Sequence, residues 1–309
     1  MRYFITGASG FIGSAVVSEL LGAGHRVLGL ARSEGSADAL RAAGAEVHRG
    51  DLDDLDGLRA AADASDGVIH LAYNHDFSSM SAAAATDRAA IEALGSALAG
   101  SNRPLLIASG TLGLSRGGVG TERDLPELGP DAHPRLATTH FALGLADRGV
   151  RAGVVRFAPT VHGRGDHGFI AYLVGVAREK GVSAYIEDGA NRWPAVHRLD
   201  AAGLVRLTVE SAPARSVVHA VAEEGIPTRE IAEAIGRGLD VPVTSIPRAE
   251  AEAHFAWMGG FFGADAPASS ALTRESFGWE PTHPGLIADL DAGHYFASRP
   301  SGDPAVSTM

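Results

Sequence analysis

The chain has 309 residues, of which 45% are hydrophobic and 20% are charged, enough for one large core or two smaller ones. Its 26 basic and 37 acidic residues give a net charge of −11, which argues against a nucleic acid or an anionic membrane as partner. The chain has no cysteine, which excludes disulfides, thiolate–metal sites, iron–sulfur clusters and a cysteine nucleophile. It has one lysine, Lys180, and five tyrosines: Tyr3, Tyr73, Tyr172, Tyr185 and Tyr295.

The termini carry no sign of export or membrane insertion. No basic stretch is followed by an apolar run and a small-residue cleavage site, and no run approaches the roughly 18 apolar residues that span a bilayer. The sequence therefore predicts a cytoplasmic protein with no membrane partner. The tail Ser298–Met309 is rich in Ser, Pro and Gly, a composition typical of disorder.

Short apolar runs alternate with amphipathic stretches through the first half of the chain. This alternation predicts a parallel sheet with helices on both faces. The expected strands are Arg2–Thr6, Arg26–Ala31, Glu46–Arg49, Gly67–Leu71, Leu105–Ser109 and Ala152–Phe157. The expected helices are Phe11–Leu21, Ser36–Ala43, Leu55–Ala62, Ser81–Leu98 and Leu136–Asp147.

The regular alternation of strands and helices ends after Pro159. We expect a helix at Ile170–Lys180, a buried strand at Ser216–Ala220, and a helix at Glu230–Leu239 that Thr228 caps. The fold class predicted is α/β, a Rossmann-type doubly wound parallel sheet with a smaller C-terminal substrate lobe. Residues 1–160 with the strand at 216–220 would form the dinucleotide-binding domain, and residues 161–215 and 221–297 the lobe.

A glycine-rich turn lies between the first strand and the first helix. Gly7 permits the tight turn, Gly10 lets backbone N–H groups approach a pyrophosphate, and Gly13 lets the helix pack close to the strand. With Ser9, Phe11 and Ile12 this turn is the predicted pyrophosphate site. The spacing is G-x-x-G-x-x-G, and the alternative is an ordinary strand-to-helix turn.

Residues that follow the next strands indicate which dinucleotide binds. A carboxylate at the end of the second strand would bind the ribose 2′-hydroxyl of NAD, but Arg32 and Ser33 stand there. A guanidinium suits a 2′-phosphate, so the sequence favours NADP(H) over NAD. The alternative is an ordinary surface arginine. The remaining expected contacts are Asp51 and Leu52 at the adenine, and Leu71 and Ala72 beneath the ribose.

These motifs resemble the extended short-chain dehydrogenase/reductases, the NAD-dependent epimerase/dehydratase family. The resemblance covers nearly the whole chain and implies a seven-stranded parallel sheet, a substrate lobe and usually a homodimer. It places Pro159 at the cofactor. The matching stretches are Thr6–Gly13, Gly50–Leu52, His70–Ala72, Val155–Gly163, Val196–Ala202 and Phe277–Pro281.

The family's chemistry fits less well. Its members use a tyrosine as acid/base, with a lysine four residues later that lowers the tyrosine pKa, and a serine or threonine that holds the substrate oxygen. Thr111 matches the hydroxyl position and Ser109 a cofactor-facing neighbour. No tyrosine lies between Tyr73 and Tyr172, so the pair is absent. Asp131 and Arg135 fall near the tyrosine and lysine positions, and Arg135 would supply charge but no proton.

The acid/base must then come from another residue. Tyr73 is the first candidate, because it follows the fourth strand at the edge where ligands bind. The other candidates are His75, Asp76, His133 and His162. For each candidate the alternative is a structural role or simple exposure to solvent.

The second half offers residues for a small-molecule substrate. The resemblance implies that Arg192, Trp193 and His197 line the cleft, and that His162 belongs to a substrate-facing polar loop. The alternative for Trp193 is an edge strand that packs it into the lobe.

We expect no metal site, because no helical histidine pair is present. Four aromatic residues of the lobe could form either a lid or part of its core: Phe255, Trp257, Phe261 and Phe262. Two helices could form either a homodimer interface or a layer packed on the sheet: Ser81–Leu98 and Leu136–Asp147.

The function that fits these expectations is an NADP(H)-dependent oxidoreductase acting on a small carbonyl or hydroxyl compound. One alternative is a non-catalytic NADP(H)-binding sensor, which would tolerate the missing pair. Another is an epimerase or dehydratase that holds its cofactor tightly.

Overall fold

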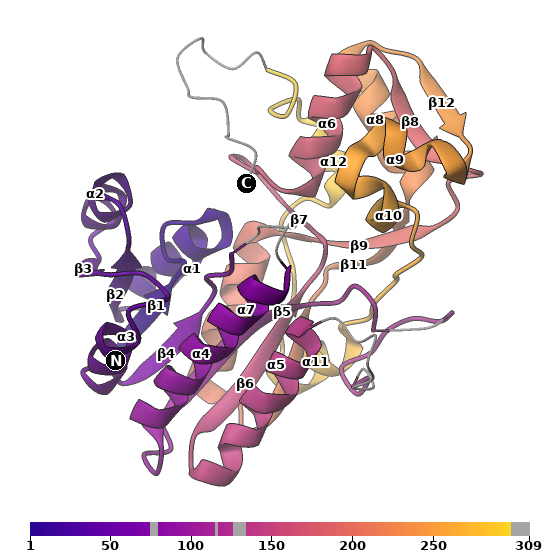
Figure 1. Cartoon of the computed structure of the whole chain (residues 1–309). Coiled ribbons are helices and arrows are strands. Elements are labelled where there is room, and N and C mark those ends of the chain that lie inside the picture. The colour runs from indigo at the N-terminus through magenta and orange to yellow at the C-terminus, as the bar shows by residue number, and fades with distance from the viewer. Residues whose placement is uncertain (75–79, 115–116, 126–133, 298–309) are drawn as a thin grey trace.

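The computed structural model describes residues 1–74, 80–114, 117–125 and 134–297 (Figure 1). The tail 298–309, for which we expect disorder, lies outside the described residues. Within these ranges no helix combines the length and the apolar character that a membrane span needs.

Seven strands form one parallel sheet in the order β10-β6-β5-β4-β1-β2-β3. Phe4 of β1, for example, lies between Leu28 of β2 and Val68 of β4. The strands are short apolar runs because both faces of the sheet are covered. This confirms the predicted Rossmann-type α/β sheet. The strands are β1 (Arg2–Thr6), β2 (Arg26–Ala31), β3 (Glu46–Arg49), β4 (Gly67–His70), β5 (Pro104–Gly110), β6 (Arg151–Phe157) and β10 (Ser216–Ala220).

Helices pack on both faces of this sheet (Figure 1). One apolar cluster joins the sheet to α1 (Phe11–Gly22), α2 (Glu34–Ala42) and α7 (Arg198–Ser211). A second cluster joins it to α3 (Leu55–Asp63), α4 (Met80–Leu98) and α5 (Pro134–Gly144). The helix expected to run to residue 147 tightens after Gly144 into a 3₁₀ turn over Leu145–Arg148.

The strand order reverses beside β1. From β1 the chain proceeds outward to β2 and β3, and then returns to β4 on the other side of β1. Parallel sheets bind ligands in the crevice that opens at such a reversal, beyond the carboxyl ends of the strands. The residues that follow β1, β2, β4 and β5 therefore share one edge of the molecule.

The smaller lobe contains two more sheets. The central strand of the first is β9 (Arg192–His197), which is parallel to β7 (Thr160–His162) and antiparallel to β11 (Glu223–Pro227). The second pairs β8 (Ser183–Ile186) with β12 (Val243–Ile246). The helices of the lobe are α6 (Phe169–Lys180), α8 (Thr228–Leu239), α9 (Ala251–Phe255), α10 (Gly259–Phe262) and α12 (Leu286–Asp291).

Two segments from the range expected for the lobe pack on the sheet domain. Helix α7 lies against α1, and the Trp279 indole N–H, just after α11 (Ala271–Phe277), donates to the Asp200 carbonyl oxygen of α7 at 3.1 Å. Trp279 is part of the same apolar cluster as α1 and α7. The two parts are thus joined by a packed helix.

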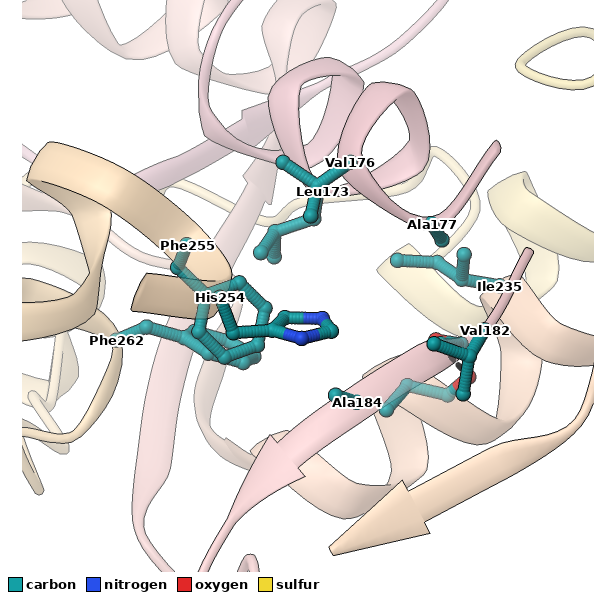
Figure 2. Close-up of a pocket in the computed structure, with 11 residues that line it drawn as sticks. Leu173, Val176, Ala177, Val182, Ala184, Ile235, His254, Phe255 and Phe262 are labelled. Atoms are coloured by element: carbon teal, nitrogen blue, oxygen red, sulfur yellow. Dashed lines mark hydrogen bonds between the residues drawn. The ribbon is translucent and has the colours of Figure 1, made fainter. Parts of the chain in front are cut away.

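The aromatic residues of the lobe mostly form its core. Phe255 and Phe262 are buried and their rings lie 5.0 Å apart. Beside them lies a cavity of about 10 Å³, room for about one water, into which the His254 ring points (Figure 2). Burial, with the nearby Lys180, lowers the pKa of His254. Phe261 is half-buried, and Trp257 is exposed and lies against Phe169 and Tyr172.

The predicted cap of the helix at 230–239 is wrong. Thr228 is the first residue of α8, and Pro227 precedes it at the N-cap position without a side-chain hydrogen bond. The Thr228 hydroxyl donates to the Asn191 side-chain oxygen at 2.7 Å. Threonine therefore serves a tertiary contact here, which local sequence spacing cannot reveal.

A buried arginine–histidine pair joins the outer strands of the sheet. Arg156 of β6 and His219 of β10 lie opposite each other, and the Arg156 Nη1 donates to the His219 Nε2 at 3.2 Å. The His219 Nδ1 lies 2.7 Å from the Ser269 carbonyl oxygen and donates to it. Burial lowers the pKa of His219 to about 4 and that of Arg156 to about 10. The imidazole is therefore neutral in the folded protein at neutral pH.

We predict that this pair makes stability depend on pH. The unfolded chain protonates this imidazole near 6.5 and the folded protein near 4, so stability is complete above pH 6.5 and falls as the pH approaches 4. The shift corresponds to roughly 3 kcal/mol. Urea unfolding at pH 7, 5.5 and 4.5 measures it. His219→Gln, which keeps an acceptor for Arg156, should give a shallower fall, and parallel profiles for the two proteins would contradict the assignment.

Candidate functional site

The glycine-rich turn lies at the reversal in strand order. Gly7 adopts a φ of +69°, and a Cβ on it would stand 2.7 Å from the Ala72 nitrogen beyond β4. A Cβ on Gly13 would stand 2.0 Å from the Gly7 carbonyl oxygen. Both positions therefore need glycine. Gly10 is the N-cap of α1, and no side chain caps that helix. Ser9 is exposed, and Phe11 and Ile12 are half-buried at the start of α1.

A chain of buried hydrogen bonds ties this turn to β4. The Ala72 N–H donates to the Thr6 hydroxyl oxygen at 3.2 Å, and that hydroxyl lies 2.8 Å from the His70 Nδ1. The His70 Nε2 lies 3.1 Å from the Asp87 carboxylate of α4. The carboxylate accepts from Nε2, so Nδ1 accepts from Thr6. This chain fixes the backbone of Leu71 and Ala72 beside Gly7.

Arginines stand at the ends of the neighbouring strands β2 and β3. Arg32 is exposed directly after β2. Arg49, at the end of β3, donates to the Ser33 carbonyl oxygen at 2.6 Å and lies 3.5 Å from the Glu34 carboxylate. The Ser33 hydroxyl accepts from the Ser36 N–H and so caps α2. The edge therefore presents a second cation that the sequence analysis did not identify.

The third strand leads into an acidic turn. Asp51 accepts hydrogen bonds from the N–H groups of Asp53 and Asp54 at 3.0 and 3.1 Å. Leu52 is half-buried and packs against the apolar cluster on that face. One carboxylate oxygen of Asp51 thus fixes the backbone just before α3.

The end of β5 holds two buried hydroxyls. The Ser109 hydroxyl lies 3.1 Å from that of Thr139 on α5. The Thr111 side chain is 2% exposed, and its hydroxyl makes no hydrogen bond to the described residues. Leaving such a group unpaired costs free energy, so Thr111 is an orphaned donor at the ligand edge.

The candidate acid/base residues are only partly described. Tyr73 is half-buried just beyond β4. Arg135 lies in the first turn of α5, but its side chain is outside the described part of the chain. The candidates His75, Asp76, Asp131 and His133 also lie outside the described residues.

Histidines and carboxylates meet where the lobe joins the sheet. His162, at the end of β7 and close after the half-buried Pro159, is fully buried, and its Nδ1 donates to Asp289 of α12 at 2.8 Å. The rings of His162 and His197 lie edge to face with centroids 5.4 Å apart. His197 stacks on His283 at 4.8 Å, and the His283 Nδ1 bonds to Asp200 at 2.8 Å.

Burial controls the charge of this cluster. Burial, with the neighbouring His162, lowers the pKa of His197 to about 4, and its Nδ1 accepts the Leu199 N–H at 3.3 Å. The imidazole is therefore neutral at neutral pH. In the adjacent loop burial raises the pKa of Asp166, which accepts from the Tyr295 hydroxyl at 2.8 Å. Among the described residues no group of three potential ligands has the arrangement of a metal site.

The structure separates the two residues expected together at the start of β9. Trp193 has no exposed surface and belongs to the lobe core, and its indole N–H donates to the Ala264 carbonyl oxygen at 3.1 Å. Its strand is central in its sheet, so the expected edge strand is a wrong assignment. Arg192 is half-exposed, and its guanidinium bonds both carboxylate oxygens of Asp265 at 3.1 and 3.0 Å.

Several site residues were missed because their partners lie far away in sequence. Asp87 and Asp289 are ordinary helix positions until they meet His70 and His162, from which they are 17 and 127 residues distant. The sequence could have identified Arg49, since it ends the strand that follows Arg32. No sequence pattern identifies Asp87 or Asp289.

Comparison with known proteins identifies relatives over the whole chain. "Uncharacterized protein C2A9.02" of Schizosaccharomyces pombe is 50% identical, covering 96% of this chain and 100% of that protein. "Uncharacterized protein YLL056C" of Saccharomyces cerevisiae is 45% identical over 95% of this chain and 99% of that protein. A solved structure with a similar fold is DesIV, a dTDP-glucose 4,6-dehydratase from Streptomyces venezuelae with NAD and TYD bound. It has a TM-score of 0.75 and 19% identity, and covers 95% of this chain and 96% of that chain.

The sheet order, the glycine turn at its reversal and the following lobe agree with a match to a family model. That model describes the NAD dependent epimerase/dehydratase family and matches residues 3–222. The match spans more than half of the chain, and this chain belongs to the NAD-dependent epimerase/dehydratase family.

Proposed function

We propose that this protein is an NADP(H)-dependent oxidoreductase that acts on a small carbonyl or hydroxyl compound. The observation that carries the proposal is the orphaned Thr111 hydroxyl, buried at the end of β5. It lies on the same edge of the sheet as the glycine turn that follows β1. A carbonyl oxygen brought to this position would accept the hydrogen bond that Thr111 lacks in the free protein.

The residues at the edge fit a dinucleotide. Helix α1 begins at an uncapped glycine, so its first N–H groups and its dipole are available to a pyrophosphate. Gly7 brings the turn against Ala72 without a side chain between them. The bound cofactor would supply or accept a hydride at its nicotinamide ring. Leu71 and Ala72, held by the chain from Thr6 to Asp87, would support its ribose.

The arginines after β2 and β3 favour NADP(H) over NAD. Arg32 forms no ion pair with the described carboxylates, and Arg49 stands beside it across the Ser33 backbone. Glu34 is the acidic residue closest in sequence; Arg41 binds it at 2.9 Å, and Arg49 lies 3.5 Å from its other carboxylate oxygen. Two guanidinium groups at this edge suit a 2′-phosphate better than a ribose hydroxyl.

The residues proposed for hydride and proton transfer differ from the tyrosine–lysine pair that the family usually uses. Thr111 would orient the substrate oxygen, and Tyr73 is the side chain with an exchangeable proton that follows β4 at the same edge. Ser109 is already held by Thr139, so it would position the end of β5 rather than bind substrate. Arg135 would add positive charge near the nicotinamide ribose.

A second candidate function is a non-catalytic NADP(H)-binding sensor. The observation that favours it is the absence of a tyrosine between Tyr73 and Tyr172, together with a lone lysine at 180. An epimerase or dehydratase with tightly held cofactor would also need an acid/base at this position. A turnover assay distinguishes the oxidoreductase from the sensor, since a sensor binds NADPH without consuming it.

We expect Arg32→Gln and Arg49→Gln each to weaken NADPH binding by roughly tenfold, because each removes a charge-assisted contact worth about 1.5 kcal/mol. NADH binding should change little. Calorimetric titration measures both affinities. Arg41→Gln removes a similar exposed cation that is bound to Glu34 and Asp38, and its affinity should stay near that of the wild type. An unchanged NADPH affinity in both test variants would refute the NADP(H) assignment.

We expect Thr111→Val to lower turnover of a carbonyl substrate by roughly 10- to 100-fold. Its unfolding free energy should not fall, because the hydroxyl makes no hydrogen bond that the mutation would break. A panel of aldehydes and ketones with NADPH, followed by urea unfolding, measures both. Thr244→Val on the exposed strand β12 is the control. NADPH binding by the wild type without turnover of any carbonyl would favour the sensor.

A further inference from the structure

Arg198 is a cation in an electrostatically unfavourable place. It is the first residue of α7, where the helix dipole repels positive charge. Helix α7 packs on α1, and both helices run back across the sheet from its carboxyl edge. The start of α7 therefore lies near the start of α1, whose own dipole adds further positive potential.

The guanidinium of Arg198 lies over the glycine-rich turn. Its carbon is 4.9 Å from the centre of the Phe11 ring, and its Nη2 lies 3.4 Å from the Ser14 hydroxyl. Its Nη1 donates to the Arg164 carbonyl oxygen at 3.0 Å. Residues of both the cofactor turn and the lobe loop thus hold this side chain.

The loop that follows β7 leaves space for this side chain. A Cβ on Gly163 would stand 3.0 Å from the Arg198 Cγ. A Cβ on Gly165 would stand 3.7 Å from the Arg198 Nη1. His167 of the same loop packs edge-on against the Phe11 ring at 5.8 Å. The loop and the first turn of α1 therefore enclose the guanidinium.

No carboxylate in the described part of the chain forms an ion pair with Arg198, whereas Arg206 further along the same helix is paired with Glu19. The nearest acid on its own helix, Asp200, accepts hydrogen bonds from Thr282 and His283 instead. Burial lowers the pKa of Arg198, as expected where desolvation is not offset by an anion. A half-buried guanidinium in this setting lacks the counter-ion that such groups usually have.

We propose that Arg198 is a pyrophosphate-binding residue, which contacts the dinucleotide from the lobe side while the start of α1 contacts it from the sheet side. The inference rests on the proposed cofactor site. It adds an anion ligand outside the glycine motif and supplies the counter-ion that Arg198 lacks. Because Arg198 begins a helix that lies between β9 and β10, it also ties cofactor binding to the junction with the lobe.

The alternative is a purely structural role, in which Arg198 links the loop to α1. Its bonds to Ser14 and Arg164 are to neutral groups, and at 3.4 Å the first is long. Two such bonds offset little of the cost of desolvating a cation between two helix N-termini. A structural role predicts that removing the charge lowers stability, whereas pyrophosphate binding predicts that it does not.

The test compares two ligands that differ in the pyrophosphate. NADP⁺ carries it, and adenosine 2′-monophosphate has the adenine and the 2′-phosphate without it. Isothermal titration gives the affinity for NADP⁺, and displacement of NADPH fluorescence gives that for the monophosphate. A wild type that prefers NAD⁺ is assayed with NAD⁺ and adenosine instead. Arg206→Gln is the matched control, since it removes the same charge from the same helix but from an ion pair with Glu19.

We expect Arg198→Gln to weaken NADP⁺ binding at least about tenfold and to leave the monophosphate affinity unchanged. Arg198→Lys should lie between the wild type and Arg198→Gln. The thermal midpoint of ligand-free Arg198→Gln should equal or exceed that of the wild type. Arg206→Gln should bind NADP⁺ normally.

Three results would overturn the inference or its basis, and each is distinct. A wild type that binds neither dinucleotide refutes the proposed function itself. Normal NADP⁺ affinity in Arg198→Gln refutes the role of Arg198 and leaves the proposed function standing. Equal loss for both ligands with a lowered midpoint shows the structural role.

Discussion

The close approach of two backbone segments at the sheet reversal is the constraint on which the rest of the site depends. Gly7 turns with a φ of +69° so near Ala72 that even a methyl group would not fit. The Thr6 hydroxyl bridges the two strands and is itself held by His70 and Asp87. Because β1 and β4 are neighbours at the reversal in strand order, these bonds fix the backbone at the point where the crevice opens.

The distribution of charge at this edge differs from that of the chain as a whole. The protein carries a net charge of −11, yet arginines stand at the ends of β2, β3 and β9. Arg49 is 3.5 Å from the Glu34 carboxylate, and Arg192 is bound to Asp265. Arg32 and Arg198 have no ion pair in the described ranges. Positive charge at this edge would favour the binding of an anionic ligand there.

Local patterns predict the sheet domain well, whereas the lobe junction depends on contacts that no local pattern records. The strands and the glycine turn follow from apolar periodicity and from the positions that only glycine can occupy. The pairing of His162 with Asp289 spans 127 residues. The sequence allows Trp193 to lie either in a cleft or in a core, because a strand of six residues does not reveal which of its faces is covered; the apolar cluster of the lobe that packs on Trp193 decides it. Thr228 has the spacing of a helix cap, but its hydroxyl bonds to Asn191, 37 residues away in sequence.

The start of α7 joins the two parts of the molecule through the side chains of His197, Arg198 and Asp200. His197 caps the helix and stacks on His283, Arg198 lies over the Phe11 ring, and Asp200 accepts from the segment that follows Trp279. A rigid helix transmits displacement along its axis, and α7 packs along α1. An anion bound to Arg198 would therefore lie within one helical turn of His197, the helix cap that stacks on His283. The proposed cofactor contact and the histidine cluster would then share one helix end, which links the charge at the sheet edge to the lobe junction.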